Sequence, residues 1–305
     1  MRVALCLLVW TLLCLRPGPT TVSAQELEPR AYSVSPVGVN VVGGSYNFKT
    51  GDLSFDPSAP IEDASATINA AGLGYVRAVG FLGRSANIGI ALPVISGHVE
   101  GLYRGEFAEV DRLGLADLRI RFAVNLFGAP AMDLKKFSRY RKNTIVGASF
   151  VVIAPIGQYD STKLINLGTN RWSIKPELAI SQALGKLTLE FYAGVWIFTD
   201  NTNFLGGRTR EQERIGTTQF HILYTIKRRM WVGFNANFYR GGTTTVDDSV
   251  NLDLQENSRY GVTLALPVTR RDSLKLSYSR GAFTTIGAEF QAFGVALQHL
   301  WGGGL

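Results

Sequence analysis

The stretch Leu115-Ala-Asp-Leu-Arg-Ile-Arg-Phe-Ala-Val-Asn-Leu126 separates into two faces when every second residue is taken together. The even positions from Leu118 onward are all apolar, and most of the odd ones are charged or amide side chains, at Asp117, Arg119, Arg121 and Asn125. Successive side chains of a strand point to opposite faces, whereas a helix would mix these two sets. The stretch therefore predicts a β-strand with one charged and one apolar face.

The same alternation recurs along the chain on both sides of this stretch. The clearest further segments are Arg171–Ser181, Leu187–Ile197, Thr217–Ile226, Met230–Tyr239, 259–268 and 274–279. Weaker segments are 37–48, 66–82, 85–100, 143–157 and 287–301. Together they predict about twelve strands.

The composition is that of a folded chain with few charges. Of the 305 residues 46% are hydrophobic and only 18% are charged, and 33 are glycine. This much apolar material excludes disorder, and the charged fraction lies below the roughly 25% that is usual for a soluble domain. A cytosolic globule is therefore disfavoured.

Residues 1–24 are predicted to be a cleaved signal peptide. Arg2 precedes an apolar run from Val3 to Leu15, and Val22-Ser-Ala24 offers the small residues that signal peptidase prefers. The run is shorter than the about 20 residues that span a bilayer. Both cysteines, Cys6 and Cys14, lie inside it, so we expect a mature chain without disulfides.

The lengths of the connections favour a membrane barrel over a soluble β-sandwich. Short connections at Gly83-Arg84, 183–186, 227–229 and 269–272 alternate with longer polar ones at 49–62, 101–112, 158–170, 199–213 and 241–256. An exception is 129–142, which is long for its side and carries Lys135, Lys136, Arg139, Arg141 and Lys142. The predicted fold is all-β, an antiparallel transmembrane β-barrel of about 12 strands in the bacterial outer membrane, with short periplasmic turns and long extracellular loops.

The barrel is expected to occupy residues 37–301, and 302–305 form a C-terminal tail. Residues 25–36 form an N-terminal lead that either hangs in the periplasm or enters the barrel as a partial plug; the sequence leaves both open. The predicted partners are outer-membrane lipids, the barrel-assembly machinery and a small solute of unknown identity. The excess of bases over acids is too mild and dispersed to predict a nucleic-acid partner.

The polar strand faces are predicted to line the lumen, either as a pore or as ion-pair ladders that fill it. The candidate lumen residues are Arg77, Asp117, Arg119, Arg121, Asn125, Arg171, Lys175, Glu177, Glu190, Gln219, His221, Asn235, Asn237, Arg259 and Lys275. Bases outnumber acids in this set, so an open pore should favour anions.

The sequence resembles a known family through a series of short motifs. They are Pro36-Val-Gly38, Tyr75-Val-Arg-Ala-Val-Gly-Phe-Leu-Gly-Arg84, Gly114-Leu-Ala-Asp-Leu-Arg119, Asn125-Leu-Phe-Gly-Ala-Pro130, Pro155-Ile-Gly-Gln-Tyr-Asp160, Asn166-Leu-Gly-Thr-Asn-Arg-Trp172, Tyr239-Arg-Gly-Gly242 and Arg259-Tyr-Gly261. In their order and spacing these resemble the outer-membrane proteins named for a MetA (meta-cleavage) pathway of phenol degradation. The resemblance implies a transport-type outer-membrane barrel.

The function expected is uptake or efflux of small solutes, such as aromatic or anionic compounds. A non-transporting structural or adhesin-like barrel and an outer-membrane lipid-modifying enzyme are the alternatives. Only three histidines are present, far apart in sequence, and there is no Gly-x-Ser-x-Gly elbow. We predict no catalytic, metal or cofactor site, because neither metal-ligand spacing nor a phosphate-binding glycine loop is found.

Overall fold

The computed structural model describes residues 27–54, 61–163 and 165–304. The predicted signal peptide and both cysteines lie outside these ranges. Within them, no helix is long and apolar enough to cross a membrane.

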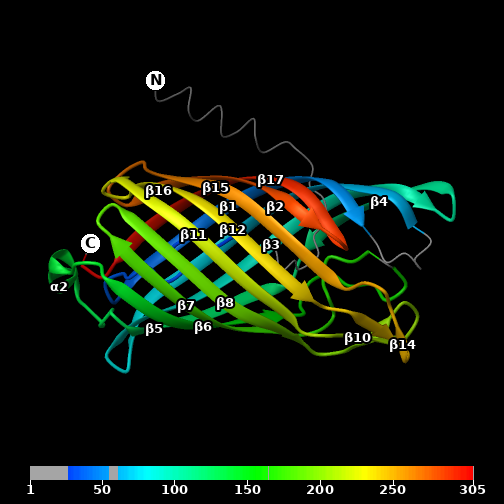
Figure 1. Ribbon diagram of the computed structural model, residues 1–305, viewed down its shortest axis with the longest axis horizontal. Helices are drawn as coiled ribbons and strands as arrows, with labels where there is room; N and C mark the ends of the chain where they lie inside the picture. Colours follow the sequence, from blue (N-terminus) through cyan, green and yellow to red (C-terminus); the bar gives the residue numbers. More distant parts are fainter. Residues whose placement is uncertain (1–26, 55–60, 164, 305) are drawn as a thin grey trace, which may run out of the picture.

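Twelve antiparallel strands close into a barrel (Figure 1), as the sequence predicted. The strands are β1 (Val39–Ser54), β2 (Ile61–Phe81), β3 (Arg84–Tyr103), β4 (Glu106–Leu115) with β5 (Leu118–Phe127), β6 (Thr144–Ala154), β7 (Ser173–Leu184), β8 (Leu187–Phe198), β11 (Ile215–Lys227), β12 (Met230–Gly241), β15 (Gln255–Pro267), β16 (Asp272–Thr284) and β17 (Gly287–Gly302). Each pairs with its neighbour in the chain, and β17 pairs with β1 to close the barrel.

Strands β4 and β5 act as one barrel strand with a break at Ala116 and Asp117. β4 pairs with the second half of β3, from Val94 to Tyr103, and β5 pairs with the first half, from Ala86 to Ala91. The predicted strand Leu115–Leu126 therefore spans this break.

The two ends of the barrel differ in their connections. At one end, here called the turn end, the connections are 82–83, 128–143, 185–186, 228–229 and 268–271, and the first and last barrel strands begin and end there. The short helix α2 (Leu134–Arg139) lies in the connection 128–143. The opposite end, the loop end, carries a second, four-stranded sheet made of β9 (Asn201–Phe204), β10 (Arg208–Gln212), β13 (Thr244–Val246) and β14 (Ser249–Val250).

In two of the predicted long loops, the described residues mostly continue the barrel strands. Strand β1 runs to Ser54, β2 begins at Ile61, and β3 and β4 are joined only by Arg104-Gly105. The prediction of loops at 49–62 and 101–112 was therefore wrong. The strands there continue as hairpins that project beyond the barrel (Figure 1). Most described side chains of β4 are exposed, so both of its faces carry polar residues and the alternation on which the prediction depended is lost.

Register assigns each strand residue to one face, because residues paired directly across antiparallel strands share a face. Ile88 of β3 pairs with Phe122 of β5, and Phe122 pairs with Phe150 of β6. The side chains of Ile88 and Phe150 are 45% and 46% exposed. Gly89, Arg121 and Val151 are paired in the same way on the other face, where Val151 is fully buried. The apolar faces thus point outward and the polar faces point into the lumen.

Candidate functional site

Residues 27–38, here called the lumen segment, lie inside the turn end of the barrel. Tyr32 makes the central contacts of this segment. The Tyr32 hydroxyl oxygen is 2.8 Å from Ser149 Oγ and 3.0 Å from Glu177 Oε1. Its ring packs edge to face on Tyr192, with centroids 5.1 Å apart. Gly147 lies beneath the ring, and a Cβ there would be 2.3 Å from Tyr32 Cδ1. This glycine is therefore needed to accommodate the tyrosine.

Charged side chains hold the first part of the lumen segment. Arg119 Nη2 donates to Glu28 Oε1 at 2.5 Å, and the Glu28 amide donates to Gln219 Oε1 at 3.0 Å. The Arg30 amide donates to Glu190 Oε2 at 2.8 Å, and its guanidinium lies 4.6 Å from the centroid of Trp231. Each contact joins the segment to a different strand of the wall.

The environment of Glu28 favours its ionised form. Burial alone would raise the pKa of this carboxyl group, but the positive charges of Arg119, Lys175, Arg121 and Lys275 outweigh burial and lower the pKa to about 2. Glu28 therefore remains an anion over the whole physiological pH range.

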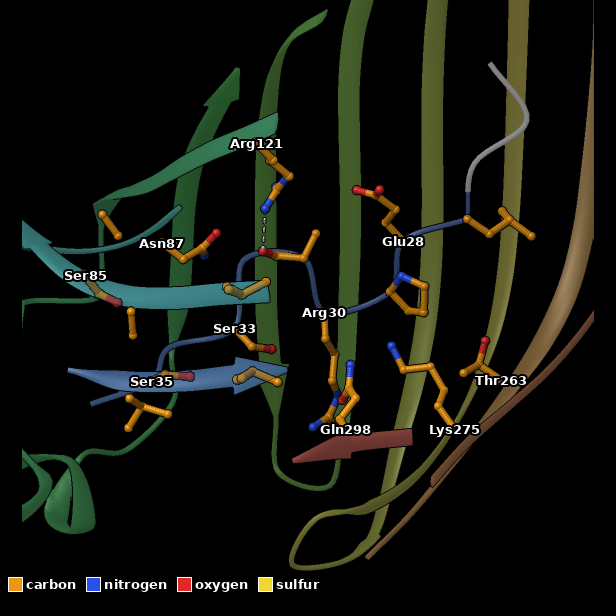
Figure 2. A pocket seen from close by; sticks show the side chains of 18 of the residues that line it. Glu28, Arg30, Ser33, Ser35, Ser85, Asn87, Arg121, Thr263, Lys275 and Gln298 are labelled. Atoms are coloured by element: carbon orange, nitrogen blue, oxygen red, sulfur yellow. Dashed lines mark hydrogen bonds between the residues drawn. The ribbon is translucent and has the colours of Figure 1, made fainter. Parts of the chain in front are cut away.

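Arg121 connects the wall to the backbone of the segment. Its Nη1 donates to the Ala31 carbonyl at 3.2 Å, the bond drawn as a dashed line in Figure 2, and its guanidinium lies 4.9 Å from the Tyr32 ring centroid. Its Nε and Nη2 atoms are buried without a hydrogen-bond partner within the described protein. These two nitrogen atoms are available to donate to an anion or to water.

A polar network continues around the wall behind the segment. Lys175 Nζ and Glu177 Oε2 are 3.1 Å apart, and both side chains are almost fully buried. His221 Nδ1 lies 2.8 Å from Asn235 Oδ1, and the Asn235 amide donates to Thr263 Oγ1 at 3.0 Å. This side of the lumen is therefore filled by side chains.

The structure brings most of the candidate lumen residues together on the inward face. Nine of them are buried there: Asn125, Lys175, Glu177, Glu190, Gln219, His221, Asn235, Asn237 and Arg259. Arg119 and Arg121 are half-buried on the same face of β5. Lys275 pairs with Ala265 and is also inward. Strand register and burial thus place these residues on the face that the sequence alternation assigns to the lumen.

Arg77 does not belong to the lumen, and its assignment was wrong. It pairs with Asn40 on one side and with the exposed Ile88 on the other, so it shares the outward face. Its neighbours in β2, Val76 and Ala78, line the lumen cavity instead. The error arose because apolar side chains occur on both faces of β2, so the alternation there is weak.

Asp117 and Arg171 belong to the loop end and not to a ladder of strand charges. Asp117 lies in the break between β4 and β5, and its carboxylate accepts from Gly157 N and Thr169 N, both at 2.9 Å, and from Thr169 Oγ1 at 2.7 Å. Arg171 precedes β7 and bonds to Gln212 of β10. Both residues therefore hold the loop 155–172 in place.

That loop lines the loop-end half of the lumen with apolar side chains. Leu167 is buried against Ile95 and Ala116, and Ile165 packs on a cluster formed by Ala66, Ile68, Val99 and Phe290. A further apolar cluster contains Val151, Ile153, Trp196, Ile215 and Tyr239. Sequence analysis missed Ile165 and Leu167, and also Glu28, Arg30 and Tyr32, because none of these residues lies on a strand and alternation gives no signal for them.

A cavity of about 470 Å³ remains beside the lumen segment (Figure 2). It is lined by the segment, by Arg121 of β5 and Thr263 of β15, and by strands β1, β2, β3, β16 and β17, among them at Val41, Val76, Asn87, Ser277 and Gln298. The inward residues of these strands are mostly small: Gly43, Ser45, Gly72, Gly74, Gly89, Ala91, Gly294 and Ala296. This small-residue wall is the reason that the segment, held on the opposite wall, leaves space here.

Metal coordination finds no support in the described ranges. No group of three or more histidine, cysteine, aspartate or glutamate side chains lies close enough to hold an ion there.

Comparison with known proteins agrees with the barrel fold. An outer membrane channel from Pseudomonas putida superposes with a TM-score of 0.77 at 22% identity, covering 90% of this chain and 100% of that one. The translocator domain of the autotransporter NalP from Neisseria meningitidis gives 0.50 at 9% identity, covering 87% and 89%. No curated protein sequence matches the chain.

The apolar outer face and the fold identify an outer-membrane protein, as the sequence predicted. A model of one protein family matches residues 50–297, most of the chain. The motifs quoted above from Tyr75 to Arg259 fall inside that range. The chain therefore belongs to the family described as "Putative MetA-pathway of phenol degradation".

Proposed function

We propose that the barrel is a channel for small organic solutes that carry an acidic group on an apolar body, such as an aromatic ring. The lumen segment sets the width of the passage. The observation that carries this proposal is the cavity of about 470 Å³ between the segment and the strands that face it. Its size admits a small organic molecule and not a folded chain.

The charges around the cavity favour an anionic solute. Three bases, Arg30, Arg121 and Lys275, and one acid, Glu28, are among its lining residues. Glu28 is already paired with Arg119, and two nitrogen atoms of Arg121 have no partner within the described residues. A cationic surplus in a narrow, partly desolvated passage attracts anions and repels cations.

The loop-end half of the lumen favours a solute that also has an apolar body. Its inward clusters around Trp196, Phe290 and Leu167 offer apolar contact. A solute that enters from the loop end would meet apolar side chains first and the bases afterwards. An aromatic carboxylate satisfies both regions.

The test is the reversal potential of the protein in a planar bilayer, measured in a gradient of potassium benzoate. We expect an anion-selective conductance, and Lys275→Gln should move the reversal potential towards cations. Arg77→Gln is the matched control, since this base lies on the outward face and should leave selectivity unchanged. Absence of conductance, both in the wild type and in the segment-releasing variant described below, would instead support a structural barrel.

A further inference from the structure

Positive charge is concentrated on the exposed surface of the turn end of the barrel. The exposed charges at the turn end are almost all basic: Arg84, Lys186, Lys227, Arg228, Arg270 and Arg271, in addition to the basic stretch around α2. The acids at this end already have local partners within the described protein: Asp133 caps α2 by accepting from Lys136 N, and Asp272 accepts from Thr269 and His299. Within the described residues, the exposed bases at the turn end therefore outnumber the acids.

The bases surround the barrel and do not form a patch on one side. They occur on each of the connections 82–83, 128–143, 185–186, 228–229 and 268–271 or on the strand residues beside them. These connections join successive strand pairs around the whole perimeter, and they lie together at the left of Figure 1. A protein partner would contact one side of such a ring, whereas a lipid leaflet contacts all of it.

An exposed apolar side chain lies within two residues of a base at each tight turn. Leu82, Leu184, Ile226 and Val268 are 41–86% exposed. Leu184 and Ile226 continue the outward apolar faces of β7 and β11. The boundary between acyl chains and headgroups therefore passes at the level of these turns, and the bases lie on its headgroup side.

Two adjacent turns are joined into one rigid basic surface. Arg229 Nη1 donates to the Thr269 carbonyl at 2.9 Å and also to the Arg270 carbonyl, and Arg229 Nη2 donates to the Asp272 carbonyl at 3.3 Å. The exposed bases Lys227, Arg228, Arg270 and Arg271 are thereby held close together, while Arg229 itself has a structural role.

We infer that the turn end is a binding surface for anionic phospholipid headgroups of the periplasmic leaflet, which the short turns of outer-membrane barrels face. Arginine and lysine bind the phosphate diester of such lipids by charge-assisted hydrogen bonds. A phosphatidylglycerol headgroup carries a net negative charge, and a phosphatidylcholine headgroup carries none. The surface therefore selects the first over the second.

The test uses the full-length barrel in phosphatidylcholine vesicles with trace spin-labelled lipid. Electron spin resonance measures how much of each labelled lipid is motionally restricted by contact with the barrel. These fractions give the ratio of the association constants of phosphatidylglycerol and phosphatidylcholine for the barrel surface. We expect a ratio of about 5 or more at low salt, since one base near a membrane surface already contributes a factor of this size. The ratio should fall as salt is added.

The decisive variant is Lys227→Gln, Arg228→Gln, Arg270→Gln and Arg271→Gln together, which leaves Arg229 in place. Its ratio should fall towards 1. The control removes the same number of exposed bases from the loop end, by Arg104→Gln, Arg208→Gln, Arg214→Gln and Arg240→Gln, and should keep most of the wild-type ratio. Heat-modified migration on gels checks that both variants are folded.

Three results would overturn the inference. The first is a wild-type ratio near 1, and the second is an equal loss in the turn-end variant and in the loop-end control. The third is binding of soluble polyglutamate to the wild type, but not to the turn-end variant, without any lipid preference. That result would assign the surface to an acidic protein partner.

Discussion

Removing the Tyr32 side chain should release the lumen segment from the wall. Tyr32 is only 2% exposed, and Tyr32→Ala removes its ring contact with Tyr192 and its hydrogen bonds to Ser149 and Glu177. Truncating a buried aromatic residue to alanine costs about 3–5 kcal/mol. Each 1.4 kcal/mol is about tenfold in an equilibrium constant, so the population with the segment released should rise by about 10² or more.

The assay exploits a mature chain that is predicted to contain no cysteine. Ser33→Cys places a thiol on the segment beside the cavity, where a maleimide carried on a long polyethylene glycol chain is too large to enter a space of about 470 Å³. The rate of gel-shift modification then follows the released population. We expect Tyr32→Ala to accelerate modification by about 10²-fold and to increase the time that single channels spend at high conductance.

The control is Tyr260→Ala, because Tyr260 is 39% exposed and lies on the outward face of the barrel, away from the lumen segment. It should leave the modification rate near that of the wild type. If Tyr32→Ala is folded, as judged by heat-modified migration, yet the thiol is modified no faster than in the wild type, then Tyr32 does not hold the segment and our reasoning is refuted.

Three further predictions concern the same segment and the loop that faces it. Gly147→Ala should accelerate Ser33→Cys modification in the wild-type background and have little effect when Tyr32 is already alanine, because the added Cβ would lie 2.3 Å from the ring; additive effects would contradict this. Docking lowers the pKa of Glu28 from 4.5 to about 2, so the contribution of Glu28 to docking is complete above pH 4.5 and is lost as the pH falls towards 2. The rate of Ser33→Cys modification, measured with an acid-tolerant thiol reagent, should therefore rise only between these pH values. Glu28→Gln should remove this pH dependence. Asp117→Ala leaves the Gly157 and Thr169 backbone N–H groups unpaired, at about 1–3 kcal/mol each, so limited proteolysis should cut the loop 155–172 faster than in the wild type while the barrel stays intact.

The strand alternation was sufficient to predict the barrel and most of its inward residues. The period of two is a local property of extended backbone, so Arg119 and Arg121 are assigned to one face without knowledge of their neighbours. The same reasoning failed at Arg77, where small and apolar residues occupy both faces of β2. It also failed in the hairpins β1–β2 and β3–β4, which extend beyond the barrel.

The sequence alone could not reveal what fills the lumen. Leu27–Ser35 have no periodic pattern, and Glu28 meets Arg119 and Tyr32 meets Glu177 across more than ninety residues of chain. The decision between an open pore and a filled one depends on such distant pairings.

By itself, then, the sequence determined the fold class, the approximate strand boundaries and the inward face, because these follow from contacts between neighbouring residues and from the hydrophobic effect. The tertiary structure decided that Asp117 fixes a loop, that Arg77 faces outward, and that a short N-terminal segment narrows the passage. Each of these depends on which side chains the closed barrel brings together, since closure sets the distance between residues that are remote in sequence.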